Sequence, residues 1–485
     1  MVALVLLSAL VVATTYWQTW AVAGLEDRQD NAIQRVAQFT VRRGLIYAAD
    51  GALLAARRAA KGDGQTLYFR RYPGGDIAAQ VVGYSTQSRS RAGLERSLND
   101  YLTASNSHLN TVLRRTLDSL EGTTVTGNNL VLTIRPDAQK IALDALGDNC
   151  GAVVALDPVT GAVLVMASSP SYDLNLVETR FFSIARRARG ARCSPPAPLV
   201  NRATAGLYAP GSTFKVVTAA AALDSGVYRP DSTFDDPGYC IEYGKKVSNY
   251  ADQSGPEVFG RVTLATALEH SINAVFCEIG KKLGPPAVLD YARRFGFYSD
   301  PPLETPSGER APSGLYDRGH LFRPHDPNQV DPGRLAFGQE RLQVTPLQMA
   351  MVAAGIANGG VVMQPYVVGK ITAPGGSTVK STDPRALSRA ISSETAAALT
   401  RMMQAVVQSG TGTAAQIPGV PVAGKTGTAE TGVRGRNTTS FIAFAPANAP
   451  RVAIAVFLEN QSGVGGRTAA PIAKTVMEAL LRSGT

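Results

Sequence analysis

The sequence predicts an α/β protein of the α+β type, in which helices flank a central, mostly antiparallel sheet beside a small N-terminal domain. Three observations predict this class. The chain has 485 residues, which is too long for one compact domain. Two apolar strand patterns near residue 150 and three near the end enclose a long stretch with helical patterns. A hydrophobic content of 45% and a charged content of 18% are typical of a folded globular protein.

An uncharged apolar segment opens the chain. Residues 1–23 carry no charged side chain and are about long enough to cross the hydrocarbon core of a bilayer. Tyr16, Trp17 and Trp20 stand near the far end, where interfacial aromatic residues gather. A cleaved signal peptide is the alternative, because Ala21-Val22-Ala23 fits a small-residue cleavage site, but the apolar run is long for one. We expect a single transmembrane anchor over 1–23, with the rest of the chain outside the cytoplasm.

Residues 24–128 are expected to form a small, irregular extracytoplasmic domain, the pedestal. Within it, residues 71–84 have the pattern of a turn and then a strand, and residues 93–102 that of the start of a helix. The pattern changes at Asn129, where we place the start of a main domain over 129–485. A strand over 130–134 and a helix over 136–146 open this domain.

The rest of the main domain has strands at both ends and helices between them. Residues 151–169 predict a hairpin of two apolar strands around a turn at 157–161. Helices are expected over 212–224, 262–283 and 345–358, and three more strands within 419–460. Pro471 is expected to open a last helix. One sheet is therefore assembled from both ends of the domain.

The charge and the histidines exclude two classes of partner. The net charge of +10 suggests anionic surroundings, but no zinc-finger, RNP or other nucleic-acid signature accompanies it. The four histidines are scattered. His320, His325 and the adjacent Asp326 could suggest a metal site, but they stand in a proline-rich loop with no further ligand nearby. We therefore predict no nucleic-acid partner, no metal and no cofactor.

Four cysteines outside the cytoplasm can form two disulfides, and the sequence leaves three pairings open. Cys150 and Cys193 flank one region, and Cys240 and Cys277 flank another, which favours these two pairs. The alternative is that Cys277 is simply a buried helix residue.

The stretch YAPGSTFKVVTAAAALDSG, residues 208–226, carries the first candidate site. Pro210-Gly211 predicts a turn, and Ser212 follows where a helix N-cap is expected. Lys215 lies on the same helix face as Ser212. In isolation, the simpler interpretation is an N-cap serine followed by a lysine that reaches solvent.

Two further motifs change that interpretation. Ser271 and Asn273 stand at the start of a predicted helix, and the string Lys425-Thr426-Gly427-Thr428 lies on a predicted strand. Each motif is weak alone, but S-x-x-K, S-x-N and K-T-G in this order form a known catalytic pattern. A serine nucleophile needs a base, and no G-x-S-x-G elbow or histidine motif supplies one. Lys215 can serve if burial and the second cation, Lys425, keep it neutral.

In this order, the motifs resemble those of the penicillin-binding proteins, specifically the class B, monofunctional transpeptidases. RRGLIYAADGALLA (42–55), YPGGDIAAQVVGY (72–84), GLERSLNDYL (93–102) and LAFGQERLQVTPLQMA (335–350) also resemble family motifs, so that the resemblance runs nearly end to end. The short pedestal is most similar to the actinobacterial penicillin-binding protein A type. Glu340 departs from the pattern, because the family usually has glycine there.

The resemblance implies a fold and a set of roles. The fold is the penicillin-binding and β-lactamase-like transpeptidase fold. Ser212 would be the nucleophile, Lys215 its base and Ser271 the proton relay. Asn273 would orient Lys215 and the substrate amide. Backbone N–H groups of Ser212 and Thr428 would form the oxyanion hole. The terminal carboxylate of a D-Ala-D-Ala stem peptide would be bound by Lys425, Thr426 and Thr428, with Gly427 letting the substrate approach.

The implied activity is peptidoglycan D,D-transpeptidation, blocked covalently by β-lactams. About 100 residues before Asn129 are too few for a glycosyltransferase domain, so the resemblance implies a separate membrane glycosyltransferase partner of the shape, elongation, division and sporulation group.

Three alternatives are less well supported. A class A β-lactamase needs an E-x-x-L-N string after the second motif, whereas Glu95 to Asn99 carries it far upstream. A β-lactam sensor would want a cytoplasmic signalling segment. A non-catalytic scaffold would tolerate decay of the motif residues, which are all intact.

Overall fold

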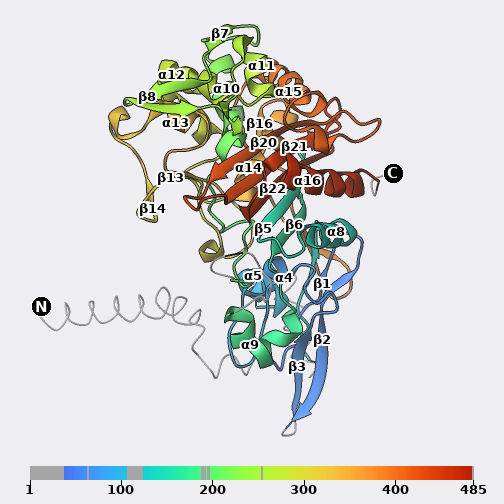
Figure 1. Cartoon of the computed structure of the whole chain (residues 1–485). Coiled ribbons are helices and arrows are strands. Elements are labelled where there is room, and N and C mark those ends of the chain that lie inside the picture. Colours follow the sequence, from blue (N-terminus) through green and yellow to red (C-terminus); the bar gives the residue numbers. More distant parts are fainter. Residues whose placement is uncertain are drawn as a thin grey trace, which may run out of the picture.

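The computed structural model describes residues 38–62, 65–105, 124–186, 193, 197–252 and 255–482. The expected transmembrane anchor lies outside these ranges. Within them, no helix combines the length and the hydropathy that a membrane crossing requires. A large domain lies above a smaller N-terminal part, from which a long hairpin projects (Figure 1).

The main sheet has five antiparallel strands in the order β20-β21-β22-β5-β6. The first three come from the end of the chain, and the other two form the hairpin predicted over 151–169. The prediction of one sheet built from both ends of the domain is therefore confirmed. The bounds are β5 (Gly151–Leu156), β6 (Val163–Ser169), β20 (Ala423–Glu430), β21 (Asn437–Ala445) and β22 (Val452–Gln461).

Helices cover both faces of this sheet. On one face, α8 (Pro136–Leu146) and α16 (Gly465–Arg482) share an apolar cluster with Val153 and Ala155 of β5. On the other face, α14 (Pro346–Ala357) packs in the cluster that contains Ala152 and Val154. Because both faces are buried, β5, β6 and β22 are mostly continuous apolar runs rather than alternating patterns. The predicted opening of the last helix at Pro471 is wrong, because α16 begins at Gly465, where it packs directly against the backbone of β20.

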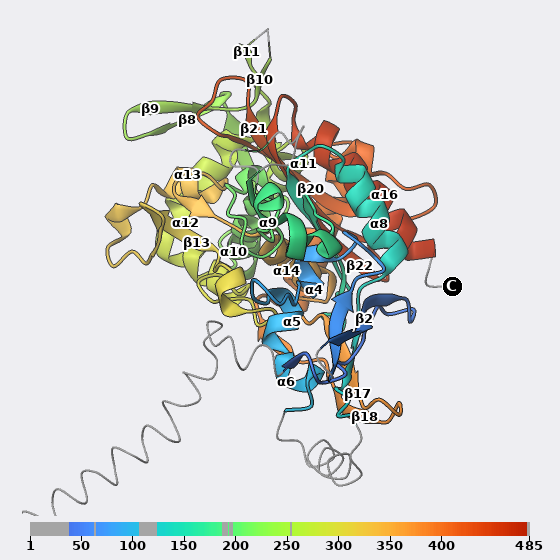
Figure 2. The same ribbon diagram turned by 90° about the horizontal axis from the view of Figure 1, so that it is seen from below.

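Most of the remaining helices of the main domain lie beyond the β20 edge of the sheet (Figure 1). The short η4 lies instead beside the pedestal, where the Gly93 N–H donates to the Glu309 carboxylate. Short hairpins lie on the outside of the helices beyond β20. Two of them, β8–β9 and β10–β11, project at one end of the molecule (Figure 2). The helices are η3 (Gly211–Phe214), α10 (Lys215–Asp224), α11 (Leu264–Glu269), α12 (Asn273–Arg294), η4 (Ser307–Glu309), η5 (Pro327–Gln329), α13 (Pro332–Ala336), α15 (Ser393–Gln408) and η6 (Thr413–Ala415). The strands are β7 (Thr233–Asp236), β8 (Tyr239–Glu242), β9 (Lys245–Ser248), β10 (Ala251–Asp252), β11 (Gly255–Pro256), β12 (Gly260–Thr263), β13 (Gly314–Asp317), β14 (His320–Phe322), β15 (Leu342–Gln343), β16 (Val361–Met363) and β19 (Ala386–Arg389).

A second sheet, of six strands in the order β18-β17-β4-β1-β2-β3, supports the N-terminal part. β4 pairs in parallel with β1 and antiparallel with β17, so this sheet combines strands from both sides of residue 129. Its strands are β1 (Ile46–Tyr47), β2 (Leu53–Gly62), β3 (Gln65–Arg71), β4 (Asn129–Leu132), β17 (Val368–Thr372) and β18 (Thr378–Ser381). The helices around it are α4 (Ala79–Val82), α5 (Gly93–Ser97), α6 (Asn99–Leu102), η2 (Leu174–Leu176) and α9 (Val177–Arg186).

The strand predicted within 71–84 is wrong, because the apolar part of that segment forms the buried helical turn α4. Gln80 explains the difference. Its side-chain amide donates to the carbonyl oxygens of Pro170 at 3.2 Å and Pro198 at 3.1 Å. These contacts to a distant segment outweigh the local preference for a strand. They cannot be predicted from the periodicity of the sequence.

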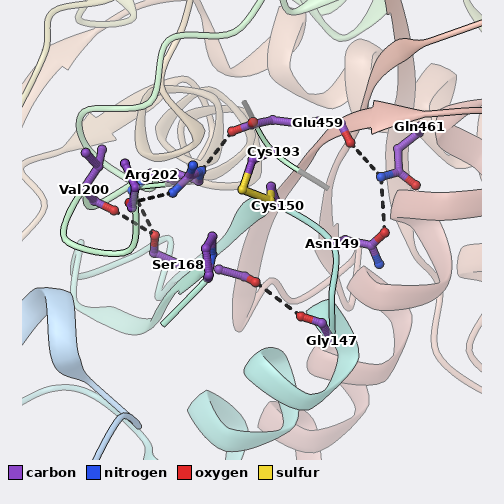
Figure 3. Close-up of a disulfide and its surroundings, with 12 residues drawn as sticks. Gly147, Asn149, Cys150, Ser168, Cys193, Val200, Arg202, Glu459 and Gln461 are labelled. Carbon is purple, nitrogen blue, oxygen red and sulfur yellow. Dashed lines mark hydrogen bonds and ion pairs between the residues drawn. A yellow bond between two sulfur atoms is a disulfide. The ribbon is translucent and has the colours of Figure 1, made fainter. Parts of the chain in front are cut away.

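Both predicted disulfides, Cys150–Cys193 and Cys240–Cys277, are present. The first ties the start of β5 to the segment before the S-x-x-K motif (Figure 3). There, the backbone N–H of Arg202 donates to Ser168 Oγ at 3.0 Å, and its guanidinium pairs with Glu459 at 2.9 Å. The chain that leads to Ser212 is thus held on β6 and β22.

Candidate active site

Ser212 lies in the single 3₁₀ turn η3, directly before α10. The expected N-cap role is wrong: the chain enters through Gly211 at φ +53°, and Pro210, which precedes η3, already has helical backbone angles. Ser212 lies inside η3, and no side chain caps either η3 or α10 with a hydrogen bond. The serine hydroxyl is therefore not committed to capping the helix.

The η3 turn packs directly against β20. A Cβ on Gly211 would lie 2.7 Å from the carbonyl oxygen of Thr428 and 3.2 Å from its nitrogen. A Cβ on Gly427 would lie 2.7 Å from the carbonyl oxygen of Pro210. Only glycine permits this approach at either position. The packing brings the Thr428 amide beside the turn that carries Ser212.

Ser271 stands in a tight turn between two helices. The single helix predicted over 262–283 is wrong, because β12 and α11 end before His270 and α12 begins at Asn273. Ser271 has φ +62°, in the left-handed region that a serine rarely adopts. Such strain is held in place by surrounding contacts and is typical of functional sites.

Four predicted residues meet in one hydrogen-bonded cluster. Lys425 Nζ donates to Ser271 Oγ at 2.9 Å, and Lys215 Nζ lies 3.4 Å from the same oxygen. Lys215 Nζ also donates to the Ser271 carbonyl at 2.6 Å and to Asn273 Oδ1 at 2.8 Å. Ser271 is therefore a bridge between the two lysines.

Both lysines are completely buried, at 0% exposure. Burial lowers the pKa of the Lys215 ammonium well below its ordinary value of 10.5, and the charge of Lys425 lowers it further. Burial also lowers the pKa of Lys425, to about 7. Desolvation disfavours the charged form, and two facing cations disfavour it again. The site therefore favours a neutral Lys215, which can accept a proton.

Asn273 is held by a support that sequence reasoning missed. Its Nδ2 donates to the carbonyl oxygen of Ser248 at 3.0 Å, which leaves Oδ1 for Lys215. The next residue along, Asn249, accepts from the Ala274 N–H at 3.0 Å and donates to the Asp236 carboxylate at 2.9 Å. No recognised motif marks Asn249 or Asp236, because their roles depend on contacts across the fold.

The two threonines of the K-T-G-T string each have a hydrogen-bond partner. Thr426 Oγ1 lies 2.7 Å from Thr411 Oγ1. Thr428 Oγ1 accepts from the backbone N–H of Gly465 at 3.2 Å. Gly427 separates them where β20 contacts the turn that carries Ser212.

The E-x-x-L-N string lies in the pedestal, in a buried ion-pair cluster. The Glu95 carboxylate pairs with Arg43 at 2.7 Å and Arg70 at 2.6 Å. Burial opposes its ionisation, but the two arginines outweigh burial and hold the pKa of Glu95 below its ordinary value. This glutamate is a structural anion of the pedestal and belongs to a different part of the molecule from the lysine cluster.

Comparisons with known proteins agree with this geometry. The penicillin-binding protein transpeptidase domain matches residues 151–478, and the penicillin-binding protein A dimerisation domain matches residues 43–130. The peptidoglycan D,D-transpeptidase PbpA of Mycolicibacterium smegmatis is 37% identical, over 99% of this chain and 98% of the relative.

Solved structures of penicillin-binding protein A from M. tuberculosis are also similar. The ceftriaxone acyl-enzyme has a TM-score of 0.81 and 34% identity, over 92% of this chain and all of that one. The penicillin G acyl-enzyme has a TM-score of 0.79 and 34% identity, over 91% of this chain and 100% of that one. The chain belongs to the class B penicillin-binding protein transpeptidases.

Proposed function

We propose that this protein is a peptidoglycan D,D-transpeptidase that works through a serine acyl-enzyme and is acylated by β-lactams. The observation that carries the proposal is the buried chain from Lys425 through Ser271 to Lys215, beside the turn that presents Ser212. A neutral lysine next to a serine supplies a nucleophile and its base without a histidine.

Acylation begins at Ser212. Its oxygen attacks the carbonyl carbon of the penultimate D-Ala, and Lys215 accepts the hydroxyl proton. The oxyanion that forms accepts hydrogen bonds from the backbone N–H groups of Ser212 and Thr428. The proton then passes through Ser271 to the leaving nitrogen. The peptide bond breaks, D-Ala leaves, and an ester to Ser212 remains.

The second half of the reaction transfers the acyl group. The amine of a second stem peptide attacks the ester carbonyl and gives up a proton to Lys215. Lys215 returns this proton to Ser212 Oγ as the ester C–O bond breaks and the new amide forms. Lys425, Thr426 and Thr428 bind the terminal carboxylate of the donor before D-Ala departs, with the compact Gly427 leaving space for the peptide. The net change is one peptide bond exchanged for another.

The protein works at the outer face of the cell membrane, anchored by residues 1–23. The two disulfides support an oxidising compartment. A monofunctional cross-linker acts on glycan made elsewhere, so its partner is a membrane glycosyltransferase of the shape, elongation, division and sporulation group. Cell fractionation tests the anchor: the full chain should sediment with membranes, and a chain that starts at residue 24 should not. Co-purification from detergent tests the partner, and its absence would contradict that part of the proposal.

Fluorescent penicillin labelling of the purified protein tests the reaction. Ser212→Ala should abolish covalent labelling and leave the thermal unfolding midpoint nearly unchanged, because one small hydroxyl is removed. Ser377→Ala, at an exposed serine, is the matched control and should label like the wild type. Labelling of Ser212→Ala at a different serine would overturn the assignment of the nucleophile.

A further inference from the structure

Thr411 contacts the proposed substrate-binding string from outside all three motifs. It is exposed, on the segment between α15 and η6, and its Oγ1 lies 2.7 Å from Thr426 Oγ1. Thr426 itself is buried, at 6% exposure. A hydrogen bond this short joins the two hydroxyl groups into one donor–acceptor chain.

The backbone around Thr411 is held by both neighbouring elements. Its N–H points to the carbonyl oxygen of Glu269 at 3.4 Å, at the end of α11 and just before the Ser271 turn. Its own carbonyl oxygen faces the start of α16, where a Cβ on Gly466 would lie 2.3 Å away. Ser409 Oγ donates to the Glu269 carboxylate at 2.6 Å. The Thr411 hydroxyl is thus presented from a position that packing defines.

The direction of this hydrogen bond matters for the chemistry. A hydroxyl has one proton, and an ionised carboxylate can only accept. When Thr426 donates its proton to a substrate carboxylate, the proton between the two threonines must come from Thr411. Thr428 already has the same arrangement, because Gly465 N–H donates to its oxygen and leaves the hydroxyl proton available.

We propose that Thr411 is a positioning residue, which orients the Thr426 hydroxyl as a donor to the terminal carboxylate of the substrate. This inference rests on the proposed function, in which Thr426 binds that carboxylate. Because the bound carboxylate is charged, the two hydrogen bonds strengthen each other. Thr411 acts only through Thr426 and is needed only when the ligand carries a carboxylate.

The test compares acylation by benzylpenicillin with acylation by its methyl ester, which lacks the anion. Thr411→Val keeps the shape and removes the hydroxyl. We expect it to lower the second-order acylation rate constant for the acid by about 5- to 30-fold, through weaker binding rather than a slower chemical step. The rate constant for the ester should change less than about twofold. Thr411→Ser should restore the wild-type rate, and Thr413→Val, at an exposed threonine two residues on, is the matched control.

Each outcome decides between explanations. An equal loss for acid and ester would show that Thr411 supports local structure only and would overturn the inference. An unchanged rate for both would overturn it as well. If the wild-type protein forms no acyl-enzyme with the acid, the proposed function fails first, and the inference fails with it. Circular dichroism of each variant checks that it is folded.

Discussion

At the scale of single residues, the unusual feature is two lysines buried together. Among the described residues, no aspartate or glutamate is hydrogen bonded to either Lys215 or Lys425. Burying an ammonium group without a carboxylate partner costs free energy, which favours loss of a proton from the lysine. The arrangement opposes stability and favours a base that is free at neutral pH.

The pH dependence of acylation tests the state of Lys215. The reaction needs the neutral amine, and the pKa of Lys215 lies well below 10.5. The rate constant should therefore already be high near neutral pH and fall as pH drops through that lowered pKa. Stopped-flow measurements with penicillin from about pH 5 to about pH 10 give the profile. Lys215→Arg, which stays charged, should lower the rate by at least about 100-fold, whereas Lys140→Arg at an exposed site should not. A rate that rises only near pH 10.5 would contradict the assignment.

Lys425→Met tests what burial of the second lysine does to stability. The pKa of Lys425 is about 7 in the folded protein, against an ordinary 10.5. Between these values the unfolded chain binds more protons, so the lysine destabilises the fold most below pH 7 and least near pH 10.5. We expect the variant to lose acylation but to gain about 1–3 kcal/mol in free energy of unfolding at neutral pH. The gain should shrink as pH rises. Urea denaturation at neutral pH and near pH 10.5 measures the difference in free energy of unfolding. A loss of stability at neutral pH would refute the argument.

Glu340 departs from the family pattern, and the structure explains why glycine is usual there. Its φ is +63°, which costs a side-chain-bearing residue about 1–2 kcal/mol. Glu340→Gly relieves this strain but makes the unfolded chain more flexible. We expect a net gain of about 0.5–1 kcal/mol in free energy of unfolding. Glu478→Gly, inside α16, should instead cost about 1 kcal/mol. Destabilisation by both changes would show that the backbone at Glu340 is not strained.

At the scale of elements, the start of α12 depends on the segment after β9. Asn249 joins this segment to Asp236 and to the Ala274 N–H, so that it positions Asn273 and through it Lys215. Asn249→Ala removes these bonds and leaves the buried Asp236 carboxylate partly unpaired. We expect a loss of about 2–4 kcal/mol in free energy of unfolding and slower acylation of the molecules that remain folded. Asn358→Ala, which ends α14, should reduce stability less and leave the acylation rate unchanged. If folded Asn249→Ala is acylated at the wild-type rate, Asn249 does not position Asn273.

The elements that the sequence predicted well are those with a strong local pattern. The β5–β6 hairpin has two apolar runs around a turn, and α8 opens with proline at its first residue, so both were predictable. The break between α11 and α12 was not. Its cause is Ser271 in a left-handed conformation, which the lysine cluster and the Asn249 support hold in place. Residues supplied by distant segments, such as Thr411 and Asp236, have no local signal at all.

At the scale of the whole molecule, the acidic residue that would mark a β-lactamase belongs to another unit. Glu95 lies buried in the pedestal between Arg43 and Arg70. Among the described residues, no carboxylate is hydrogen bonded to the cluster of Lys215, Ser271 and Lys425. Within the part of the chain that the structure describes, this cluster therefore offers Lys215 but no hydrogen-bonded carboxylate that could serve as a separate base for water.

The lifetime of the penicillin acyl-enzyme follows from this division. The natural acyl-enzyme loses D-Ala and leaves room for an acceptor amine, whereas a penicilloyl group keeps its ring fragment in the cleft. We expect Lys215 to be the remaining base and the retained fragment to block the approach of water to it. We expect an acyl-enzyme that persists far longer than a catalytic turnover, with negligible hydrolysis of the antibiotic. Intact-mass spectrometry over time should show the mass of the protein plus one penicillin, and Ser212→Ala, the matched control, should show the unmodified mass throughout. Rapid return of the wild-type protein to its unmodified mass, with a stoichiometric excess of hydrolysed drug, would instead identify a β-lactamase.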